Sequence, residues 1–471
     1  MINFWNYEKF NDKKNYLIDD SDLKFQYPIF SEKIQEIITK IEEIKSRRVG
    51  ILVCSNSLSW LAAYLSILNK GLVPLLVPTD YPEKALNSLL KKFKASWVWD
   101  ARNIEHIDNA NFVSKVVDGF ETFHENFEFF VSNDDLALMM GTSGSTGSPK
   151  FVKISYDSLQ SNANSICEYL NLQNSDSTIT TLPSSYSYGL SLINTHLNAS
   201  GSIVISNLSP ITRGFYELID AHSISNISGV PTLYELYKRT GFLKKQFKSL
   251  KFLTQAGGHL HEDLKYEFLK YTQFNDMDFY IMYGQTEATA RMSYVPPKML
   301  ENNINSIGIP IPGGAFDLNP ENSELIYRGK NVMMGYAECF DDLQKKDQMN
   351  GELKTGDIAR IGSNGLFYIT GRIKRIIKLN GTRVSLDEIE KEISSETKLS
   401  IFAIGNDGIL KIIIYKNAEF SDESLNKVKS YLSKKLRLLK KQYEINIIDI
   451  IPFLDNGKVD YGTLKSLYGI K

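Results

Sequence analysis

The chain has 471 residues, with 54 lysines and arginines against 55 aspartates and glutamates and a formal net charge of −1. This length is enough for a large hydrophobic core and for more than one domain. The opposite charges are interspersed and lysine pairs such as Lys434–Lys435 are typical of a solvated helix face, so the composition argues against a nucleic-acid-binding protein.

Cysteine usage and apolar runs exclude further classes of protein. Cys54, Cys167 and Cys339 are too few and too scattered for a disulfide framework or a zinc site, so we expect each to be a small buried or half-buried side chain. The first residues show neither the basic nor the apolar region of a secretory signal. The apolar stretch 58–77 is interrupted by Asn69-Lys70-Gly71 and therefore predicts a helix, a turn and a strand, not a membrane span. We expect a cytoplasmic protein.

In the first half of the chain, apolar runs typical of strands alternate with periodic runs typical of helices, which predicts an α/β fold. The predicted strands are 48–55, 72–77, 96–100, 136–140, 178–182, 202–206 and 226–229. The predicted helices between them are 57–69, 157–170 and 231–239.

A run of glycines and hydroxyl residues follows the strand 136–140 and ends in a lysine: Thr142-Ser143-Gly144-Ser145-Thr146-Gly147-Ser148-Pro149-Lys150. Glycines let backbone N–H groups approach a ligand, and hydroxyls with an ammonium complete a cradle for polyphosphate oxygens. In isolation such a run is more often a surface loop. It is not a Walker loop, because Phe151 follows the lysine where a Mg²⁺-binding Ser or Thr is required, and no kinase H-R-D or D-F-G element follows.

The pattern changes after residue 371 to that of a compact α+β unit of about 100 residues, a normal domain size. The predicted elements are a strand over 372–379, a turn at 380–381, a helix from a Ser385 cap to about 394, a hairpin over 401–405 and 410–415, a helix over 421–439 and a strand over 443–451. We therefore predict two domains, residues 1–371 and 372–471.

Five segments, in order, resemble the motifs of the adenylate-forming (AMP-binding) superfamily of acyl- and aryl-CoA synthetases, peptide-synthetase adenylation domains and luciferases. They are the loop 142–150, Tyr283-Gly284-Gln285-Thr286-Glu287, Thr355-Gly356-Asp357, the segment that begins Gly371-Arg372-Ile373-Lys374, and Asn456-Gly457-Lys458-Val459-Asp460. The resemblance spans residues 140–460 and implies a large N-terminal domain of stacked mixed sheets flanked by helices, with a small mobile C-terminal domain.

The resemblance implies a ligase that forms carbon–sulfur bonds. Such an enzyme activates a small carboxylic acid with ATP as acyl-AMP, releases pyrophosphate, and transfers the acyl group to the thiol of CoA or of a phosphopantetheinyl carrier protein. Because both reactants are anionic, the first step needs cations and N–H donors and no general base. By resemblance, Lys458 is the main catalytic cation, Thr286 contacts phosphate, and Glu287 is a catalytic residue that binds Mg²⁺.

The resemblance also implies an ATP site and a hinge. The residues implied to bind ATP are Thr142, Ser143, Gly144, Ser145, Thr146, Gly147, Lys150, Ala256, Gly257, Gly258, Tyr283, Gly284, Asp357 and Arg372. Tyr283 would stack on adenine and Asp357 would accept hydrogen bonds from the ribose, whereas without the motifs they would be a core residue and a member of a surface ion pair. Lys374 is implied to be the hinge at which the C-terminal domain rotates between the two half-reactions.

Three further residues are predicted to line the acyl pocket, Tyr186, Tyr188 and Gly189. Amino-acid-activating members of the superfamily carry an aspartate that pairs with the substrate ammonium, and Gly189 stands at that place. A buried ammonium without a counter-ion is costly, so this glycine favours an acid without an α-amino group. Acyl- and aryl-CoA ligases usually carry a gating histidine where Tyr186 stands.

Other functions stay open at this point. An amino-acid–carrier-protein ligase is the main alternative, and activation of amino acids but not of simple acids would favour it. A non-catalytic binding protein is disfavoured because Glu287, Asp357 and Lys458 are all present, and no residue supports luciferase-type oxidation. No carrier attachment motif follows residue 460, so we expect any carrier protein to be a separate chain.

Overall fold

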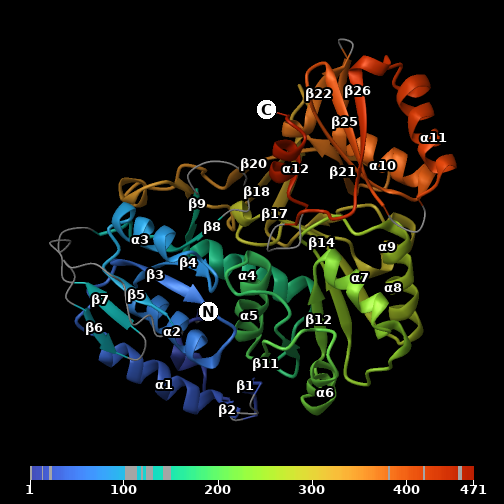
Figure 1. The fold of residues 1–471 in the computed structure, drawn as a ribbon. Coiled ribbons are helices and arrows are strands. Elements are labelled where there is room, and N and C mark those ends of the chain that lie inside the picture. Colours follow the sequence, from blue (N-terminus) through green and yellow to red (C-terminus); the bar gives the residue numbers. More distant parts are fainter. Residues whose placement is uncertain are drawn as a thin grey trace. The chain divides into compact units, whose positions relative to one another are not determined.

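The structure is a computed structural model that describes residues 3–12, 14–20, 24–100, 114–117, 120–123, 131–141, 150–379, 382–416, 420–453 and 459–470. Its contacts divide the chain into two compact units (Figure 1). The N unit comprises Met1–Ala315 and Tyr327–Leu353, and the C unit comprises Phe316–Ile326 and Lys354–Lys471. The mixed α/β fold predicted from the sequence is confirmed. The predicted domain boundary at residues 371–372 stays a prediction.

The N unit contains two large sheets. Among the described residues, the first has nine strands in the order β16-β15-β14-β13-β12-β10-β11-β1-β2. The central strands pair in parallel, whereas β2 at one edge, and β15 and β16 toward the other, pair antiparallel. The strand bounds are β1 Tyr16–Asp19, β2 Lys24–Gln26, β10 Ser177–Ile179, β11 Ser202–Ile205, β12 Asn226–Gly229, β13 Phe252–Gln255, β14 Asp278–Tyr283, β15 Ser293–Tyr294 and β16 Ile309–Pro310.

The second sheet of the N unit has eight strands within the described residues, in the order β19-β9-β8-β4-β3-β5-β7-β6. Strands β3, β4, β5 and β8 pair in parallel, and their buried runs of valine, isoleucine and leucine are typical of a sheet covered on both faces. The strand bounds are β3 Val49–Cys54, β4 Val73–Pro78, β5 Trp97–Trp99, β6 Ser114–Val117, β7 Phe120–Phe123, β8 Leu136–Gly141, β9 Phe151–Ser155 and β19 Gly335–Ala337.

Helices α4 and α5 pack against each other, with α4 also touching β8 and β9 and α5 touching β10 and β11 (Figure 1). Helix α5 is buried along almost its whole length, because it carries small, apolar and hydroxyl side chains all round. The helices of the N unit are α1 Tyr27–Lys40, α2 Leu58–Lys70, α3 Glu83–Lys92, α4 Tyr156–Tyr169, α5 Ser187–Ala199, α6 Arg213–Ala221, α7 Pro231–Arg239, α8 Glu262–Phe274 and α9 Pro297–Leu300, with 3₁₀ turns η1 Tyr7–Lys9, η2 Phe242–Lys244, η3 Thr286–Ala288, η4 Glu301–Asn303 and η5 Phe340–Leu343.

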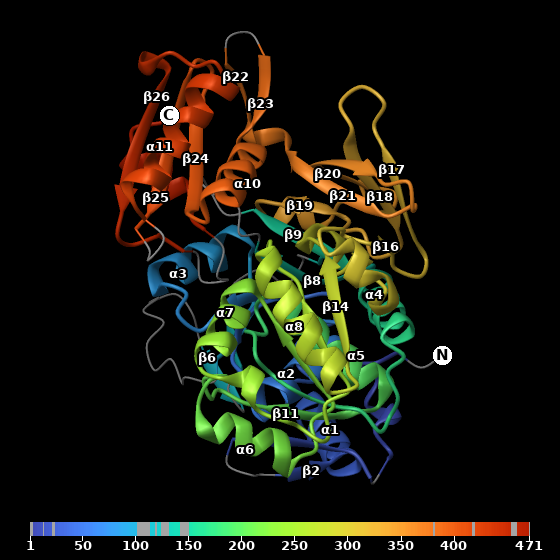
Figure 2. The same cartoon turned by 90° about the vertical axis from the view of Figure 1, so that its right-hand side faces the viewer.

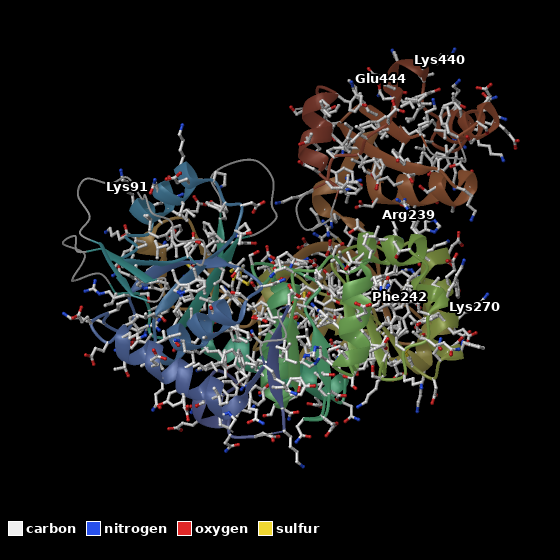
Figure 3. The ribbon with its side chains drawn as sticks, turned by 60° about the horizontal axis from the view of Figure 1, so that its bottom comes forward. Lys91, Arg239, Phe242, Lys270, Lys440 and Glu444 are labelled. Atoms are coloured by element: carbon white, nitrogen blue, oxygen red, sulfur yellow. The ribbon has the colours of Figure 1, made fainter. Side chains whose placement is uncertain are left out.

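Helices α7 and α8 lie beside the nine-stranded sheet (Figure 2), and a cluster of aromatic side chains packs between them and the sheet. The Tyr234 ring meets the Phe268 ring edge-on at 4.7 Å, and Phe242 packs 4.7 Å from Tyr237. Phe242 is fully buried among these helices, whereas Arg239 and Lys270 lie at the surface (Figure 3). Such pairs hold the sheet edge that carries the loops after β12, β13 and β14.

The C unit has a four-stranded sheet in the order β17-β18-β20-β21, a hairpin β22-β23 and a three-stranded sheet β24-β25-β26 within its described residues. The strand bounds are β17 Gly314–Leu318, β18 Glu324–Gly329, β20 Glu352–Ile361, β21 Phe367–Arg372, β22 Ile376–Leu379, β23 Thr382–Ser385, β24 Ser400–Asn406, β25 Ile409–Tyr415 and β26 Tyr443–Ile448. The helices are α10 Leu386–Thr397, α11 Asp422–Ser430 and α12 Tyr461–Leu467, with η6 Ile373–Arg375, the π-helical turn η7 Tyr431–Lys435 and η8 Lys440–Gln442.

A buried ionic cluster ties the start of the C-terminal segment to its last helix. Arg375 pairs with Asp387 at 2.5 Å and with Glu390 at 2.6 Å, and its guanidinium lies 3.8 Å from the Tyr461 ring centroid. The Tyr461 hydroxyl and the Ala403 N–H both donate to the Glu390 carboxylate, at 3.0 and 2.6 Å. The hydrogen bonds satisfy the carboxylate, which is the condition for burying such a pair.

Two predicted elements of the C-terminal segment differ from the structure. The predicted strand 372–379 is broken by the turn η6, where the Arg375 side chain turns inward to Asp387 and Glu390. The predicted helix 421–439 is α-helical only to Ser430, and Arg437 has a φ of +54°, which no right-handed helix accommodates. The predicted hairpin 401–415 and the Ser385 cap, which accepts a hydrogen bond from the Glu388 N–H at 3.3 Å, are confirmed. The predicted turn 380–381 lies outside the described residues.

The structure also tests what the composition predicted for the cysteines and for membrane-spanning helices. All three cysteines are free, Cys54 buried and the other two half-buried, as predicted. In the described part of the chain, no helix is both long and apolar enough to cross a membrane.

Substitution of Gly50 tests the packing of the eight-stranded sheet. A Cβ at Gly50 would lie 2.0 Å from the Trp97 ring, so Gly50→Ala is expected to lower the free energy of unfolding by roughly 1–3 kcal/mol through overpacking. Urea denaturation followed by tryptophan fluorescence measures this. Gly141→Ala on β8 is the matched control, because its Cβ would meet Phe151 at an ordinary 3.8 Å. Equal stability of the two variants would contradict the packing described.

Candidate active site

The predicted site residues are divided between what the structure describes and what it does not. Thr142, Ser143, Gly144, Ser145, Thr146, Gly147 and Lys458 lie outside the described residues. Lys150, the 256–258 segment, Tyr186–Gly189 and Tyr283–Glu287 belong to the N unit, and Asp357, Arg372 and Lys374 belong to the C unit.

Three loops of the N unit meet at one edge of the nine-stranded sheet. Strands β10, β13 and β14 are parallel members of that sheet, so the segments that follow them leave from the same edge. The loop after β10 leads to Tyr186 and Ser187, and the Ser187 hydroxyl lies 3.2 Å from the Thr286 hydroxyl. A Cβ at Gly257 (φ +87°) would lie 2.7 Å from the Tyr186 hydroxyl. The structure thus brings together pocket, phosphate and adenine residues predicted from separate segments.

The chain turns sharply after the Tyr283–Glu287 motif. Thr289 has φ +65° and ψ −57°, and the Ala290 N–H donates to the Ala288 carbonyl at 2.7 Å, which together define a γ-turn of the strained kind. The turn returns the chain against Gly284, where a Cβ would lie 1.9 Å from the Ala290 carbonyl oxygen. A residue in such a conformation costs on the order of 1–3 kcal/mol and persists only where its surroundings hold it.

Asn331 supplies that restraint. Its side-chain amide donates to the Ala288 carbonyl at 2.9 Å and to the Arg291 carbonyl at 2.8 Å, on the two sides of the turn. The Thr289 hydroxyl donates to the Asn331 carbonyl at 2.8 Å, and the Tyr327 hydroxyl donates to the Asn331 side-chain oxygen at 2.8 Å. The buried amide therefore holds the turn from both ends.

Glu287 is held at two points. The Met333 N–H donates to its backbone carbonyl at 2.9 Å, and the Tyr336 hydroxyl donates to its Oε1 at 2.9 Å. Burial and the neighbouring carboxylate raise the pKa of Tyr336, so this hydroxyl keeps its proton and stays a donor.

Glu287 also fits a magnesium ligand. Its Oε2 accepts no hydrogen bond from any described residue. The described residues hold no group of three or more His, Cys, Asp or Glu side chains that could bind a metal. One carboxylate with substrate phosphates and water is the coordination that Mg²⁺ commonly takes in nucleotide sites.

Lys150 is exposed and pairs with Glu338 at 2.9 Å. Exposed ion pairs contribute little to stability, so the ammonium can exchange this carboxylate for a phosphate at small cost.

The predicted acyl-pocket residues line the buried side of the same region. Tyr188 is buried and its hydroxyl lies 2.8 Å from the Thr254 hydroxyl, while the Arg291 guanidinium lies 3.8 Å from the Tyr188 ring centroid. Burial raises the pKa of Tyr186 to about 12, so that hydroxyl is neutral near pH 7. A Cβ at Gly189 would lie 2.1 Å from the Pro183 carbonyl oxygen, so packing excludes a side chain at this position.

In the C unit, Asp357 and Arg372 are paired. Asp357 is buried, and its Oδ1 lies 2.9 Å from Nε of the more exposed Arg372 across the neighbouring strands β20 and β21. Lys374 is exposed in the turn η6. The pair is consistent with either of the two interpretations of these residues, a ribose contact or a structural ion pair.

Sequence reasoning missed Arg291, Asn331 and Tyr336. Arg291 carried a signal, because a lone arginine follows Ala288-Thr289-Ala290 directly after the motif. Asn331 and Tyr336 carried none, because the residues that they contact in and after the motif lie 40 to 49 residues away in the sequence.

The chain is similar in sequence and in fold to known proteins. The sequence profile of the AMP-binding enzyme family matches residues 38–337. A D-alanine–D-alanyl carrier protein ligase of Staphylococcus aureus (strain Newman) is 25% identical over 423 residues, covering 83% of each chain. The o-succinylbenzoate CoA synthetase of Bacillus subtilis, in complex with its acyl-adenylate intermediate, superposes with a TM-score of 0.77 at 18% identity over 98% of each chain. The McyG A-PCP structure with phenylalanyl-adenylate gives 0.75 at 18% identity, over 99% of this chain and 95% of that one.

Removal of the Tyr336 hydroxyl tests its role at Glu287. Tyr336→Phe frees the carboxylate from one donor, and a single hydrogen bond contributes about 1 kcal/mol, so the Mg²⁺ concentration for half-maximal activity is expected to change by roughly 3–10-fold. A Mg²⁺ titration of ATP–pyrophosphate exchange measures it. Tyr156→Phe is the control, since its hydroxyl bonds the Leu68 carbonyl elsewhere in the N unit. An unchanged Mg²⁺ dependence in Tyr336→Phe would separate this tyrosine from the metal.

Proposed function

Since the chain belongs to the AMP-binding enzyme family, we propose that it is a ligase that converts a carboxylic acid and ATP into acyl-AMP and pyrophosphate and then transfers the acyl group to a thiol. The observation that carries this proposal is the meeting of Tyr186, Ser187, Thr286 and Gly257 at one sheet edge beside Glu287. Ligands of open α/β sheets bind at the carboxyl ends of the strands, which is where these segments lie.

The described residues supply parts of the first half-reaction. The acid's carboxylate oxygen attacks the α-phosphorus of ATP while pyrophosphate leaves, so negative charge accumulates on the phosphate oxygens. Glu287 would hold Mg²⁺, which neutralises phosphate charge when bound, and Thr286 would donate to a phosphate oxygen. Lys150 would exchange Glu338 for phosphate. Lys458 would supply the cation for the reacting oxygens.

For the thiol, we favour the phosphopantetheine of a separate carrier protein. The relative from S. aureus is named as a carrier protein ligase and covers 83% of each chain. The structural neighbours include both a CoA synthetase and an adenylation protein joined to a carrier domain, so CoA is the second outcome. Single-turnover transfer from preformed adenylate to CoA, or to a phosphopantetheinylated carrier protein, distinguishes the two.

An amino acid is the second candidate substrate, because the S. aureus relative is named for D-alanine. Two features of the N unit favour an acid without an amino group. Gly189 cannot be replaced by an acidic side chain without a clash with Pro183. Arg291 places a buried positive charge against Tyr188, and a second cation there would be repelled. ATP–pyrophosphate exchange over fatty, aryl, hydroxy and amino acids tests the choice.

Lys458→Ala tests the catalytic cation. Loss of a charge that stabilises the transition state is expected to reduce ATP–pyrophosphate exchange by roughly 10²–10³-fold. Lys440→Ala, which removes an exposed lysine of the same unit, is the matched control and should keep full activity (Figure 3). Near-normal exchange in Lys458→Ala would remove this residue from the reaction.

Lys374→Pro tests the proposed hinge. Proline restricts the backbone of its own residue and of Ile373, so rotation between the two half-reactions should be blocked. We expect acyl-AMP formation to stay within about threefold of the wild type, while thiol transfer falls by at least tenfold, as for other variants that impair a conformational step. Equal loss of both steps would argue against a hinge at this position.

A further inference from the structure

Arg291 carries a buried charge that no described acidic side chain neutralises. The residue is 3% exposed. Its Nε has no hydrogen-bond partner, and its Nη1 makes one long contact, 3.4 Å to the Ala290 carbonyl. The face of the guanidinium packs on the Tyr188 ring at 3.8 Å, a cation–π contact. Such a contact does not use the in-plane N–H donors, of which one is hydrogen-bonded to the Tyr169 side chain and Nε has no partner.

The guanidinium lines a small cavity inside the N unit. Tyr169, Ser191, Thr195, Thr254 and Met282 line it with Arg291, and the space holds about one water-sized group. No aspartate or glutamate contributes to its wall. The lining therefore contains one fixed positive charge, while the Ser191 and Thr195 hydroxyls already donate to backbone carbonyls at 2.7 and 2.8 Å.

His196, which also lines this cavity, adds no second charge. Its Nδ1 lies 2.8 Å from the Leu192 carbonyl and so carries the proton, while its Nε2 accepts from the Asn226 amide at 3.0 Å. Burial lowers the pKa of His196 to about 4, which keeps the ring neutral near pH 7. Arg291 is thus the cation of this cavity.

The cavity adjoins the proposed adenylate site. The Met292 N–H donates to the Tyr283 carbonyl at 2.9 Å, and the Arg291 Cα would lie 2.9 Å from a Cβ at Gly284. On the other side, the Tyr188 ring that covers Arg291 packs edge-on against Tyr186 with 6.4 Å between centroids. Arg291 therefore lies directly behind the residues predicted to contact the acid and the adenine.

A desolvated guanidinium without a counter-ion is costly, and a cation–π contact offsets only part of that cost. The Asn331 amide and the Asn162 amide both donate to the Arg291 carbonyl, at 2.8 and 3.1 Å, so the backbone cannot easily move the side chain out to solvent. An anionic group of a bound ligand is the partner that such a site lacks. A carboxylate matches the guanidinium by two parallel hydrogen bonds.

We propose that the acid activated by this enzyme is a dicarboxylic acid whose second carboxylate binds Arg291. The inference rests on the proposed function and names its substrate class. One carboxylate forms the bond to the α-phosphorus as pyrophosphate leaves, and the other stays ionised and pairs with the Arg291 guanidinium. The acyl group passed to the thiol then retains a free carboxylate.

The wild-type enzyme tests the proposal without any substitution. Linear dicarboxylic acids of three to six carbons are compared, in ATP–pyrophosphate exchange, with their monomethyl esters, which have nearly the same length and lack the second charge. We expect kcat/KM for the best diacid to exceed that for its monomethyl ester by roughly 100-fold, as when one partner of a buried charge pair is removed. Equal rates, or a preference for monocarboxylic or amino acids, would overturn the proposal and leave the proposed adenylation intact. If none of the acids supports exchange, both proposals are overturned.

Arg291→Met tests the assignment to this side chain. It is expected to lower the ratio of kcat/KM for the diacid to that for its monomethyl ester to about one, whatever the absolute activity on either, and Arg291→Lys should retain part of the preference because its charge remains. Arg239→Met, at an exposed arginine on α7, is the matched control (Figure 3). A diacid preference that survives in Arg291→Met would contradict the assignment. Thermal unfolding of each variant identifies misfolded protein. If Arg291→Met does not fold, the diacid preferences of Arg291→Lys and of the wild type test the assignment.

Discussion

The strained turn at Thr289 is the constraint on which the proposed site depends. It reverses the chain within three residues, so that Glu287 remains half-buried at the sheet edge while Arg291 enters the interior. The Asn331 amide bonds both sides of the turn, and its backbone carbonyl accepts from the Thr289 hydroxyl. Because several hydrogen bonds hold this strained turn, both its position and the direction in which the chain leaves it are fixed. One asparagine thereby sets where the proposed metal ligand Glu287 and the buried cation Arg291 lie relative to each other.

The charges around this turn match the electrostatic problem of adenylation. Two anionic reactants must be held together, which requires positive charge at defined points and exclusion of water. Lys150 is exposed and exchangeable, whereas Arg291 is desolvated and fixed by Tyr188. An exposed cation suits phosphates that enter and leave, and a buried one suits discrimination among acids, because only a buried charge imposes a large cost when its partner is missing.

Local sequence patterns predicted much of the fold because most elements of the N unit follow their own periodicity. The strand predicted at 226–229 and the helix predicted at 231–239 have the same bounds as β12 and α7. Where tertiary contacts override the pattern, prediction failed: the inward pull on Arg375 breaks the strand predicted over 372–379. The motif residues of the proposed site could be predicted from sequence because each motif is contiguous. Tyr336 and Asn331 act on that motif from another segment, and such a contact leaves no periodic or spacing signal.

The cluster of Arg375, Glu390 and Tyr461 has a mechanical consequence. It joins the residue directly after Lys374 to the first residue of α12, three positions beyond Lys458. Arg375 and Tyr461, which are 86 residues apart in sequence, are thus held together by one buried contact. A backbone rotation at Lys374 would then be passed directly to the segment that contains Lys458, with little loss through deformation of the intervening sheets. Weakening this cluster would uncouple the movement of the Lys458 ammonium from a rotation at Lys374, even though neither lysine had been substituted.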